Sequence, residues 1–350
     1  MKKTQKTIIL SMILSILLGA CADSHMTQPT EQETQSIETD DTIYDGLIEN
    51  PKPLEKQNAY DVLNVATYIT KAEDTYFIAD CYHDQILFSD ALTKPLMEWK
   101  VLTDEVHYAH TIASDGITLL VDDTENNRLL AFQRTDAGYV HTQTLDEIGL
   151  KPHFVQYDEK KQMFYAWSSI TGELYLIKKY DKPNEQGIYP LYIEGIAKID
   201  ELYGVYVRSF TIIDDELYFV SGHNNQKIIK AKIAHDGEAF ALEVTEHYDV
   251  PAELAGMVQL YKIQDYYYIT ISTDNAENQD YATIIRTKRL EDLMTGKYED
   301  IYSEFGLSGG TPYYINEIEG RYYMTHHRTS ENIIAFDVTD NVIQNVEVLY

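Results

Sequence analysis

The chain has 350 residues, of which 57 are acidic and 28 are basic, and its formal net charge is −29. A negative field of this size repels phosphate backbones and anionic lipid head groups, which argues against binding to nucleic acid and against close docking on a membrane surface. The same charge keeps an exported protein soluble, and it does not by itself indicate a cation site.

Residues 1–20 are predicted to form a signal peptide. A basic start precedes an apolar run, Ile8 to Leu18, which is too short to span ~30 Å of hydrocarbon as a helix. The ending Leu18-Gly19-Ala20-Cys21 resembles the bacterial lipobox. This resemblance implies that Cys21 is acylated and ties the chain to the lipid bilayer, on the extracytoplasmic side of the cell membrane. The alternative is an ordinary signal peptide, cleaved near Ala20 or Ala22.

Residues 21–57 are predicted to be an acidic, flexible tether. Thr, Gln, Glu and Asp predominate here, and so few large apolar side chains cannot offset the entropy lost on ordering. A random coil of this length holds the next domain roughly 35 Å from the membrane. The folded domain is expected over residues 58–350. If Cys21 carries lipid, Cys81 is the remaining thiol, and we interpret it as a small buried filler.

A strand-turn-strand unit recurs six times in this domain. Its clearest copy runs from Leu119 to Phe132, and the other copies begin near Tyr76, Met163, Leu217, Tyr267 and Tyr322. Spacings of roughly 40 to 55 residues between short alternating strands are typical of a radial β repeat. The sequence therefore predicts an all-β fold, a six-bladed β-propeller with four antiparallel strands per blade.

The second blade shows the expected strands most clearly. We place them at His110–Ser114, Ile117–Asp122, Arg128–Arg134 and Gly138–Thr144, with a hairpin turn at Asp115-Gly116. The stretch Val121 to Leu129 resembles the NHL-type repeat of six-bladed propellers, and the other blades keep its pattern but lose the Asn-Arg pair.

Three later segments carry separate predictions. Blade five has an insertion around residues 274–280, and its 289–295 stretch could form a helical turn. The final strand, 342–350, is expected to close the ring beside blade one. The Gly306-Leu307-Ser308-Gly309-Gly310 run matches Gly-x-Ser-x-Gly, but no helix is expected to follow it. We therefore interpret it as a loop between blades.

In a four-stranded blade, the start of the first strand and the loop between the second and third strands share one face. Counting back from each hairpin turn places Tyr68, His110, His153, Arg208, Gln259 and Tyr314 around the mouth of the central channel. Polar side chains of the facing loops complete a funnel, where a ligand is expected. The predicted ligand-binding residues are His110, His153, Arg208, Asp122, Asp123, Trp167, His223, His326 and Arg328.

Some of these residues have a plainer interpretation. Asp122, with Asn126, Asn127 and Arg128, can fix its own turn through hydrogen bonds to the backbone. Trp167 can stack on a sugar or pack between blades. Arg208 implies either a carboxylate partner or an anionic ligand, because it is a cation in so acidic a chain.

The sequence identifies no metal, no cofactor and no catalytic constellation. His107, His110 and His153 could supply a three-histidine site, but their spacing does not require one. The first functional hypothesis is a surface-anchored lipoprotein whose funnel binds a small molecule, a glycan or a peptide. The alternatives are a metal-assisted hydrolase or lyase in the same funnel and an interaction scaffold for envelope proteins.

Overall fold

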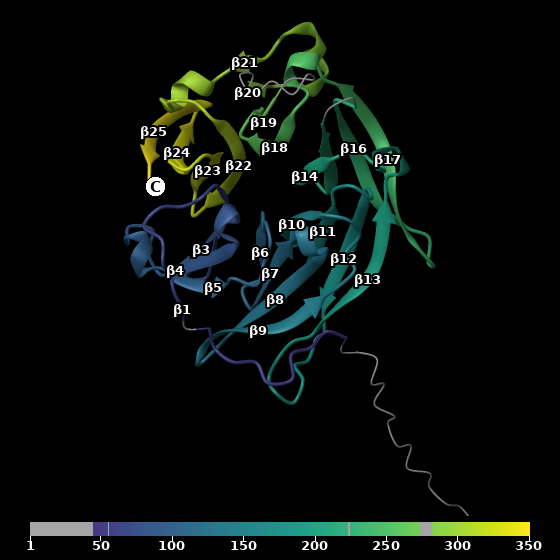
Figure 1. The fold of residues 1–350 in the computed structure, drawn as a ribbon. Helices are drawn as coiled ribbons and strands as arrows, with labels where there is room; N and C mark the ends of the chain where they lie inside the picture. Colours follow the sequence, from purple (N-terminus) through teal and green to yellow (C-terminus); the bar gives the residue numbers. More distant parts are fainter. Residues whose placement is uncertain (1–44, 55, 223–224, 274–281) are drawn as a thin grey trace, which may run out of the picture. The chain divides into compact units, whose positions relative to one another are not determined.

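A computed structural model describes residues 45–54, 56–222, 225–273 and 282–350. In the domain that they form, six antiparallel sheets are arranged radially around one centre (Figure 1). Each sheet holds four strands that are consecutive in the sequence, and one sheet gains a fifth strand from the N-terminal side. The predicted all-β, six-bladed β-propeller is confirmed.

In each blade four consecutive strands run outward from the centre in chain order, and in blade one β1 is added outside β5. Blade one contains β2 (Ala66–Ala72), β3 (Thr75–Asp80), β4 (Gln85–Ser89), β5 (Lys100–Thr103) and the added β1 (Lys56–Gln57). Blade two contains β6 (Ile112–Ser114), β7 (Thr118–Asp123), β8 (Arg128–Thr135) and β9 (Gly138–Leu145). Blade three contains β10 (Pro152–Asp158), β11 (Met163–Ser168), β12 (Glu173–Lys179) and β13 (Leu191–Lys198).

The second half of the domain repeats this arrangement. Blade four contains β14 (Val207–Ile213), β15 (Glu216–Ser221), β16 (Lys227–His235) and β17 (Phe240–Asp249). Blade five contains β18 (Met257–Ile263), β19 (Tyr266–Ile271), β20 (Thr283–Thr287) and β21 (Glu299–Asp300). Blade six contains β22 (Thr311–Ile318), β23 (Arg321–His327), β24 (Ile333–Thr339) and β25 (Val342–Val348).

Helical structure in the described residues is confined to short 3-10 turns. These are η2 (Cys81–His83), η3 (Leu96–Glu98), η4 (Thr124–Asn126), η5 (Asp200–Leu202), η6 (Ala252–Leu254), η8 (Leu290–Thr295) and η9 (Tyr302–Phe305). The helical turn expected at 289–295 is therefore present as η8. Within the described ranges, no helix has the length and apolar character that a membrane crossing requires.

Buried hydroxyl groups near the axis join neighbouring blades. The Thr67 hydroxyl of blade one donates to the Ala109 carbonyl, 3.3 Å away, and the Thr111 hydroxyl of blade two accepts the Val155 amide of blade three at 2.8 Å. The Ser209 hydroxyl of blade four donates to the Val258 carbonyl of blade five at 2.7 Å. Because these groups are buried, each bond satisfies a polar atom that would otherwise cost stability.

The ring closes between blades six and one through backbone and side-chain contacts, and the Val65 amide donates to the Arg328 carbonyl at 3.2 Å. The Thr325 hydroxyl of β23 donates to the Thr67 carbonyl of β2 at 2.7 Å. The predicted final strand does not pair with blade one: β25 is the outermost strand of blade six and pairs with β24. Instead Tyr350 reaches blade one, where its ring meets the Trp99 ring edge-on, at a centroid distance of 6.1 Å.

The N-terminal boundary of the domain lies earlier than predicted. Residues 46–54 run antiparallel to β9, where the Ile48 amide donates to the Thr142 carbonyl at 3.0 Å and Pro53 bridges to Val140. Residues 56 and 57 then form β1 on the edge of β5. This segment covers the edges of two sheets through backbone contacts, which do not require apolar side chains. Its polar composition therefore did not indicate that it is ordered.

Candidate functional site

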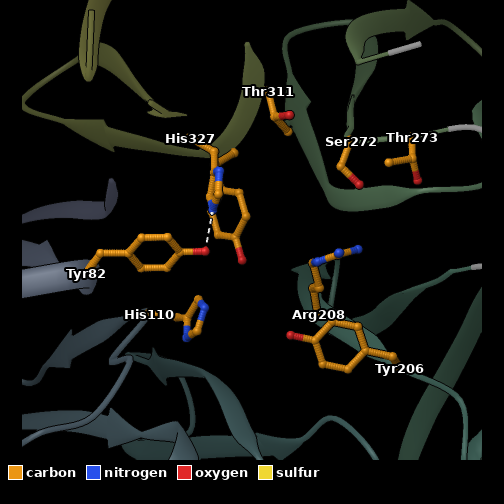
Figure 2. A pocket seen from close by; sticks show the side chains of 9 residues that line it. Tyr82, His110, Tyr206, Arg208, Ser272, Thr273, Thr311 and His327 are labelled. Atoms are coloured by element: carbon orange, nitrogen blue, oxygen red, sulfur yellow. Dashed lines mark hydrogen bonds between the residues drawn. The ribbon is translucent and has the colours of Figure 1, made fainter. Parts of the chain in front are cut away.

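A cavity of about 230 Å³ lies where the starts of the first strands meet the loops between the second and third strands (Figure 2). It is lined by Tyr82, His110, Tyr206, Arg208, Ser272, Thr273, Thr311, Tyr313 and His327. These residues come from blades one, two, four, five and six, so the cavity exists only in the assembled ring. Of the six residues predicted at the mouth of the channel, His110 and Arg208 line this cavity.

Aromatic rings fill the axis beside the cavity. The Tyr68 ring lies 6.1 Å from the Tyr314 ring, and the Phe154 ring lies 5.2 Å from Tyr314 and 5.4 Å from Phe210, all nearly edge-on. Edge-to-face pairs at these distances pack tightly. Tyr68 and Tyr314, which were expected at the mouth, are therefore part of this packing.

Arg208 is the cation of the cavity wall. It lies in the β-bulge at the start of β14, between Val207 and Phe210, and a bulge of this kind redirects a side chain out of the ladder. Its guanidinium stands over the Tyr206 ring at 5.0 Å from the centroid, and one Nη is 3.5 Å from the Met257 carbonyl. No carboxylate of the described residues lies within ion-pair distance of it. Of the two interpretations of Arg208, the carboxylate partner is therefore not found among the described residues.

Two phenols stand beside this cation. Neither the Tyr206 nor the Tyr313 hydroxyl has a hydrogen-bond partner among the described residues, although Tyr313 is only 6% exposed. Burial is the main cause that raises the pKa of both phenols, so they stay protonated and can donate. Arg208 and these phenols thus offer donors to one small volume.

His110 and His153 form a stacked pair at the inner side of the cavity. Their ring centroids are 3.8 Å apart, and the Nδ1 atom of His110 is 3.0 Å from the Thr124 hydroxyl. Burial lowers the pKa of His110 to about 3 and moves the pKa of His153 well below its usual value. His110 lines the cavity, whereas His153 is fully buried behind it, with its Nε2 atom unpaired among the described residues.

The two predicted aspartates are buried and hold loops. Asp122 accepts the backbone amides of His110 and Thr111, which removes these residues from the ladder and starts β6 at Ile112 rather than at His110. Asp123 accepts the His107 amide and the Nε of Arg128, each at 2.7 Å. Asp122 and Asp123 thus fix the backbone of the segment before β6, whereas the plainer interpretation had Asp122 fix its own turn. Burial raises the pKa of Asp122 to about 6.

Three other predicted residues lie outside the cavity wall. Trp167 is fully buried, packs on the Phe219 ring of blade four and donates to the Val207 carbonyl. His326 is buried, with its Nδ1 atom 3.2 Å from the Glu331 carbonyl. Arg328 forms an ion pair with Glu331 and secures the 306–310 loop. His223, like the insertion at 274–280 and Cys21, lies outside the described residues.

The three-histidine group is not assembled as a metal site. His107 directs its Nδ1 atom to Asp84, at 3.1 Å, and its ring stacks on Tyr108. Over the described parts of the chain, no group of three or more His, Cys, Asp or Glu side chains is placed to hold a metal ion. The loop with the Gly-x-Ser-x-Gly match is followed by β22 and not by a helix, and its Ser308 hydroxyl donates to Glu331.

Sequence reasoning missed several cavity residues, three of which are tyrosines. Counting back from the hairpin turn selected Tyr314 in place of Tyr313, because the bulge between Pro312 and Ile315 breaks the alternation of β22. Four other first strands carry a similar bulge near their starts. Tyr206 precedes its strand, and Tyr82 lies in η2, so neither could be found by strand counting.

No family model matches the chain, and no curated protein matches it in sequence. Solved structures match its fold. A candidate 6-phosphogluconolactonase from Bacteroides uniformis has a TM-score of 0.55 at 11% identity, over 83% of this chain and 88% of that chain. A streptogramin B lyase structure has a TM-score of 0.52 at 13% identity, over 84% and 86%. At such identities the likeness shows the fold alone. The fold and the cavity together define a six-bladed β-propeller with a polar cavity.

Proposed function

We propose that the propeller binds a small anionic ligand in the cavity, through Arg208. The observation that carries this proposal is the position of the Arg208 guanidinium on the cavity wall, with no carboxylate of the described residues within 4.0 Å. The described residues supply no counter-charge to this partly buried cation, and a bound carboxylate or phosphate would supply one. The protonated Tyr206 and Tyr313 hydroxyls would add neutral donors to the same anion.

The charge of the whole chain makes this cation distinctive. With 57 acidic and 28 basic residues, most cations can be paired, as Arg134 is with Asp74. Arg208 instead rests on an aromatic face, which keeps its donors available. The cavity is below the roughly 300–1,000 Å³ of sites for drug-sized ligands, so it suits one ring-sized molecule or the end group of a longer one.

Calorimetric titration of the purified protein with inorganic phosphate, D-glucuronate and cyclohexanecarboxylate tests the proposal. We expect saturable binding of at least one anion and a loss of tenfold or more in Arg208→Met, because a hydrogen bond to a charged group contributes about 1.5–3 kcal/mol. Arg134→Met is the matched control, since Arg134 is an exposed arginine outside the cavity wall, and it should bind as the parent does. Binding that survives Arg208→Met, or no binding of any of the three anions, would contradict the proposal.

We also propose that acylated Cys21 anchors the protein on the extracytoplasmic side of the cell membrane. The lipobox-like ending and the preceding apolar run support this. Labelled palmitate should enter the parent protein, which should sediment with membranes, and Cys21→Ala should take up no label. Equal labelling of both proteins, or an unlabelled parent in the culture medium, would sink this proposal.

A further inference from the structure

We infer that the ligand is a polyhydroxylated anion of the sugar-acid class, a carboxylated or phosphorylated sugar-sized molecule. This inference rests on the proposed anion site and concerns the part of the ligand that lies away from Arg208, which should carry hydroxyl groups. It follows from hydrogen-bond acceptors on the side of the cavity away from Arg208. In Figure 2, Tyr82 and His110 stand on one side of the cavity, and Arg208 and Tyr206 stand on the other.

The first acceptor is the Nε2 atom of His110. The Thr124 hydroxyl has one proton, and two acceptors lie 2.8 Å from its oxygen: the Asp122 carboxylate and the Pro152 carbonyl. Thr124 therefore accepts from His110, which places the imidazole proton on Nδ1. Since Thr124 is not part of the cavity wall, Nε2 is the nitrogen left for the cavity side.

This lone pair lacks a strong donor among the described residues. The Cys81 sulfur lies 4.0 Å from Nε2, which is a weak contact at most. The pKa of His110 is about 3 because of burial, so the imidazole remains an uncharged acceptor at neutral pH. A ligand that covers His110 without donating to it would leave a buried acceptor unpaired, which lowers its affinity.

The second position is the Tyr82 hydroxyl, which lies 3.2 Å from the Nε2 atom of His327. A phenol can donate once and can also accept, so in either tautomer of His327 the Tyr82 hydroxyl keeps one role for a ligand. The centroid of the Tyr82 ring lies 5.2 Å from that of the Tyr108 ring, and Tyr82 is 45% exposed. This side of the cavity combines an aromatic surface with hydrogen-bonding atoms, which suits the ring and hydroxyl groups of a sugar.

The two sides therefore demand different chemistry from one small molecule. An alkyl acid would satisfy Arg208 but would leave the His110 acceptor unpaired. A neutral sugar would satisfy His110 but would leave the guanidinium without an anion. A molecule with an acid group at one end and hydroxyl groups at the other satisfies both, and a carboxylate and a phosphate meet the cation equally well.

A set of matched ligands tests the inference. D-glucuronate and cyclohexanecarboxylate share a six-membered ring and a carboxylate but differ in hydroxyl groups, and D-glucose has the hydroxyl groups without the charge. Glucose 6-phosphate tests the phosphate as the source of charge. By calorimetry we expect D-glucuronate or glucose 6-phosphate to bind at least tenfold more tightly than both cyclohexanecarboxylate and D-glucose.

Two variants assign the preference to its residues. In His110→Phe, which keeps a ring for the stack on His153, the advantage of D-glucuronate over cyclohexanecarboxylate should fall at least fivefold. His110→Gln, whose amide oxygen can accept again, should restore part of it. The unfolding midpoint of each variant shows whether the fold is retained.

The outcomes separate this inference from the anion site. If cyclohexanecarboxylate binds as tightly as D-glucuronate and depends on Arg208, the anion site stands and the sugar-acid inference is wrong. If the preference for D-glucuronate survives in His110→Phe, the assignment to His110 is wrong. If no acid binds in an Arg208-dependent manner, both proposals fail together.

Discussion

The imidazoles of His110 and His153 stack at a centroid distance of 3.8 Å, with their planes inclined by 29°. Burial lowers the pKa of both rings, so two neutral imidazoles and not two imidazolium ions face each other at neutral pH. Protonating either ring would place a charge in a buried site beside its neighbour and near Arg208. The stack therefore links the inner wall of the cavity to the pH stability of the domain.

The free energy of unfolding should fall as the pH drops below about 6.5. On unfolding, the two histidines regain an ordinary pKa of 6.5, so below that pH the unfolded chain binds protons that the folded chain excludes. Each histidine then costs about 1.4 kcal/mol per pH unit. For His110 this continues down to about pH 3.

His153→Phe should make this slope shallower. Between about pH 6 and 3.8, Asp122 increases the free energy of unfolding as the pH falls, because burial raises its pKa in the folded chain. The contribution of His153 is therefore measured as the difference in slope between the parent and the variant. The Tyr314 hydroxyl keeps its bond to the Arg208 carbonyl when His153 is replaced. Urea unfolding at pH 7, 6, 5 and 4.5 should show a slope smaller by about 1.4 kcal/mol per pH unit. Identical slopes in parent and variant would argue that His153 is not held neutral by burial.

Asp123→Ala should destabilise the domain strongly. The buried carboxylate accepts from the His107 amide, the Asn126 amide group and the Arg128 guanidinium, so its loss leaves these donors without their partner. Breaking a buried charge pair costs about 3–5 kcal/mol, and the lower end applies because Arg128 is partly exposed. Arg134→Ala breaks an exposed pair and should cost at most about 1 kcal/mol. Urea unfolding that shows equal losses would refute the structural role of Asp123.

The fold was largely predictable from the sequence, because its signals are local. Hairpin turns such as Asp115-Gly116 and alternating strands recur within each blade, and every blade is built from strands adjacent in the chain. The cavity was predictable only in part. His110 and Arg208 were found because they sit at or just before the start of a first strand, whereas Tyr313 was displaced by a bulge that strand counting does not detect. Asp122 and Trp167 were selected by residue type, but burial gives both a packing role.

Gly46→Ala should destabilise the domain more than Gly187→Ala does. Both glycines have a positive φ, of 74° and 80°, so both substitutions carry the same backbone strain of roughly 1–2 kcal/mol. A Cβ atom at Gly46 would also lie 1.8 Å from the Thr144 carbonyl oxygen, whereas nothing lies within 4 Å at Gly187. The additional loss measures how firmly residues 46–54 hold the edge of β9. Equal melting temperatures for the two variants would show that this segment contributes little to stability.

Tyr350→Ala should loosen the seam between blades six and one. The Tyr350 ring packs against Trp99, and its hydroxyl donates to the Leu92 and Lys94 carbonyls of blade one. Losing this partly exposed ring and its hydrogen bonds should lower the free energy of unfolding by about 2 kcal/mol. Removing a fully buried aromatic ring would lower it by about 3–5 kcal/mol. Tyr203, which is 75% exposed, provides the control, and Tyr203→Ala should change the melting temperature little. If Tyr350→Ala changes the melting temperature no more than Tyr203→Ala does, the contact between blades six and one depends on the inner strands alone.

The order of strands within the blades has a consequence for how the ring comes together during synthesis. Because each sheet uses four consecutive strands, a blade can form as soon as its own segment has emerged, and closing short loops costs little entropy. The contact between blades six and one is different, since its outer part needs Tyr350, which follows all the strands of the propeller in the chain. A truncated chain could then carry formed blades around an open ring, without the wall that blades four, five and six give the cavity.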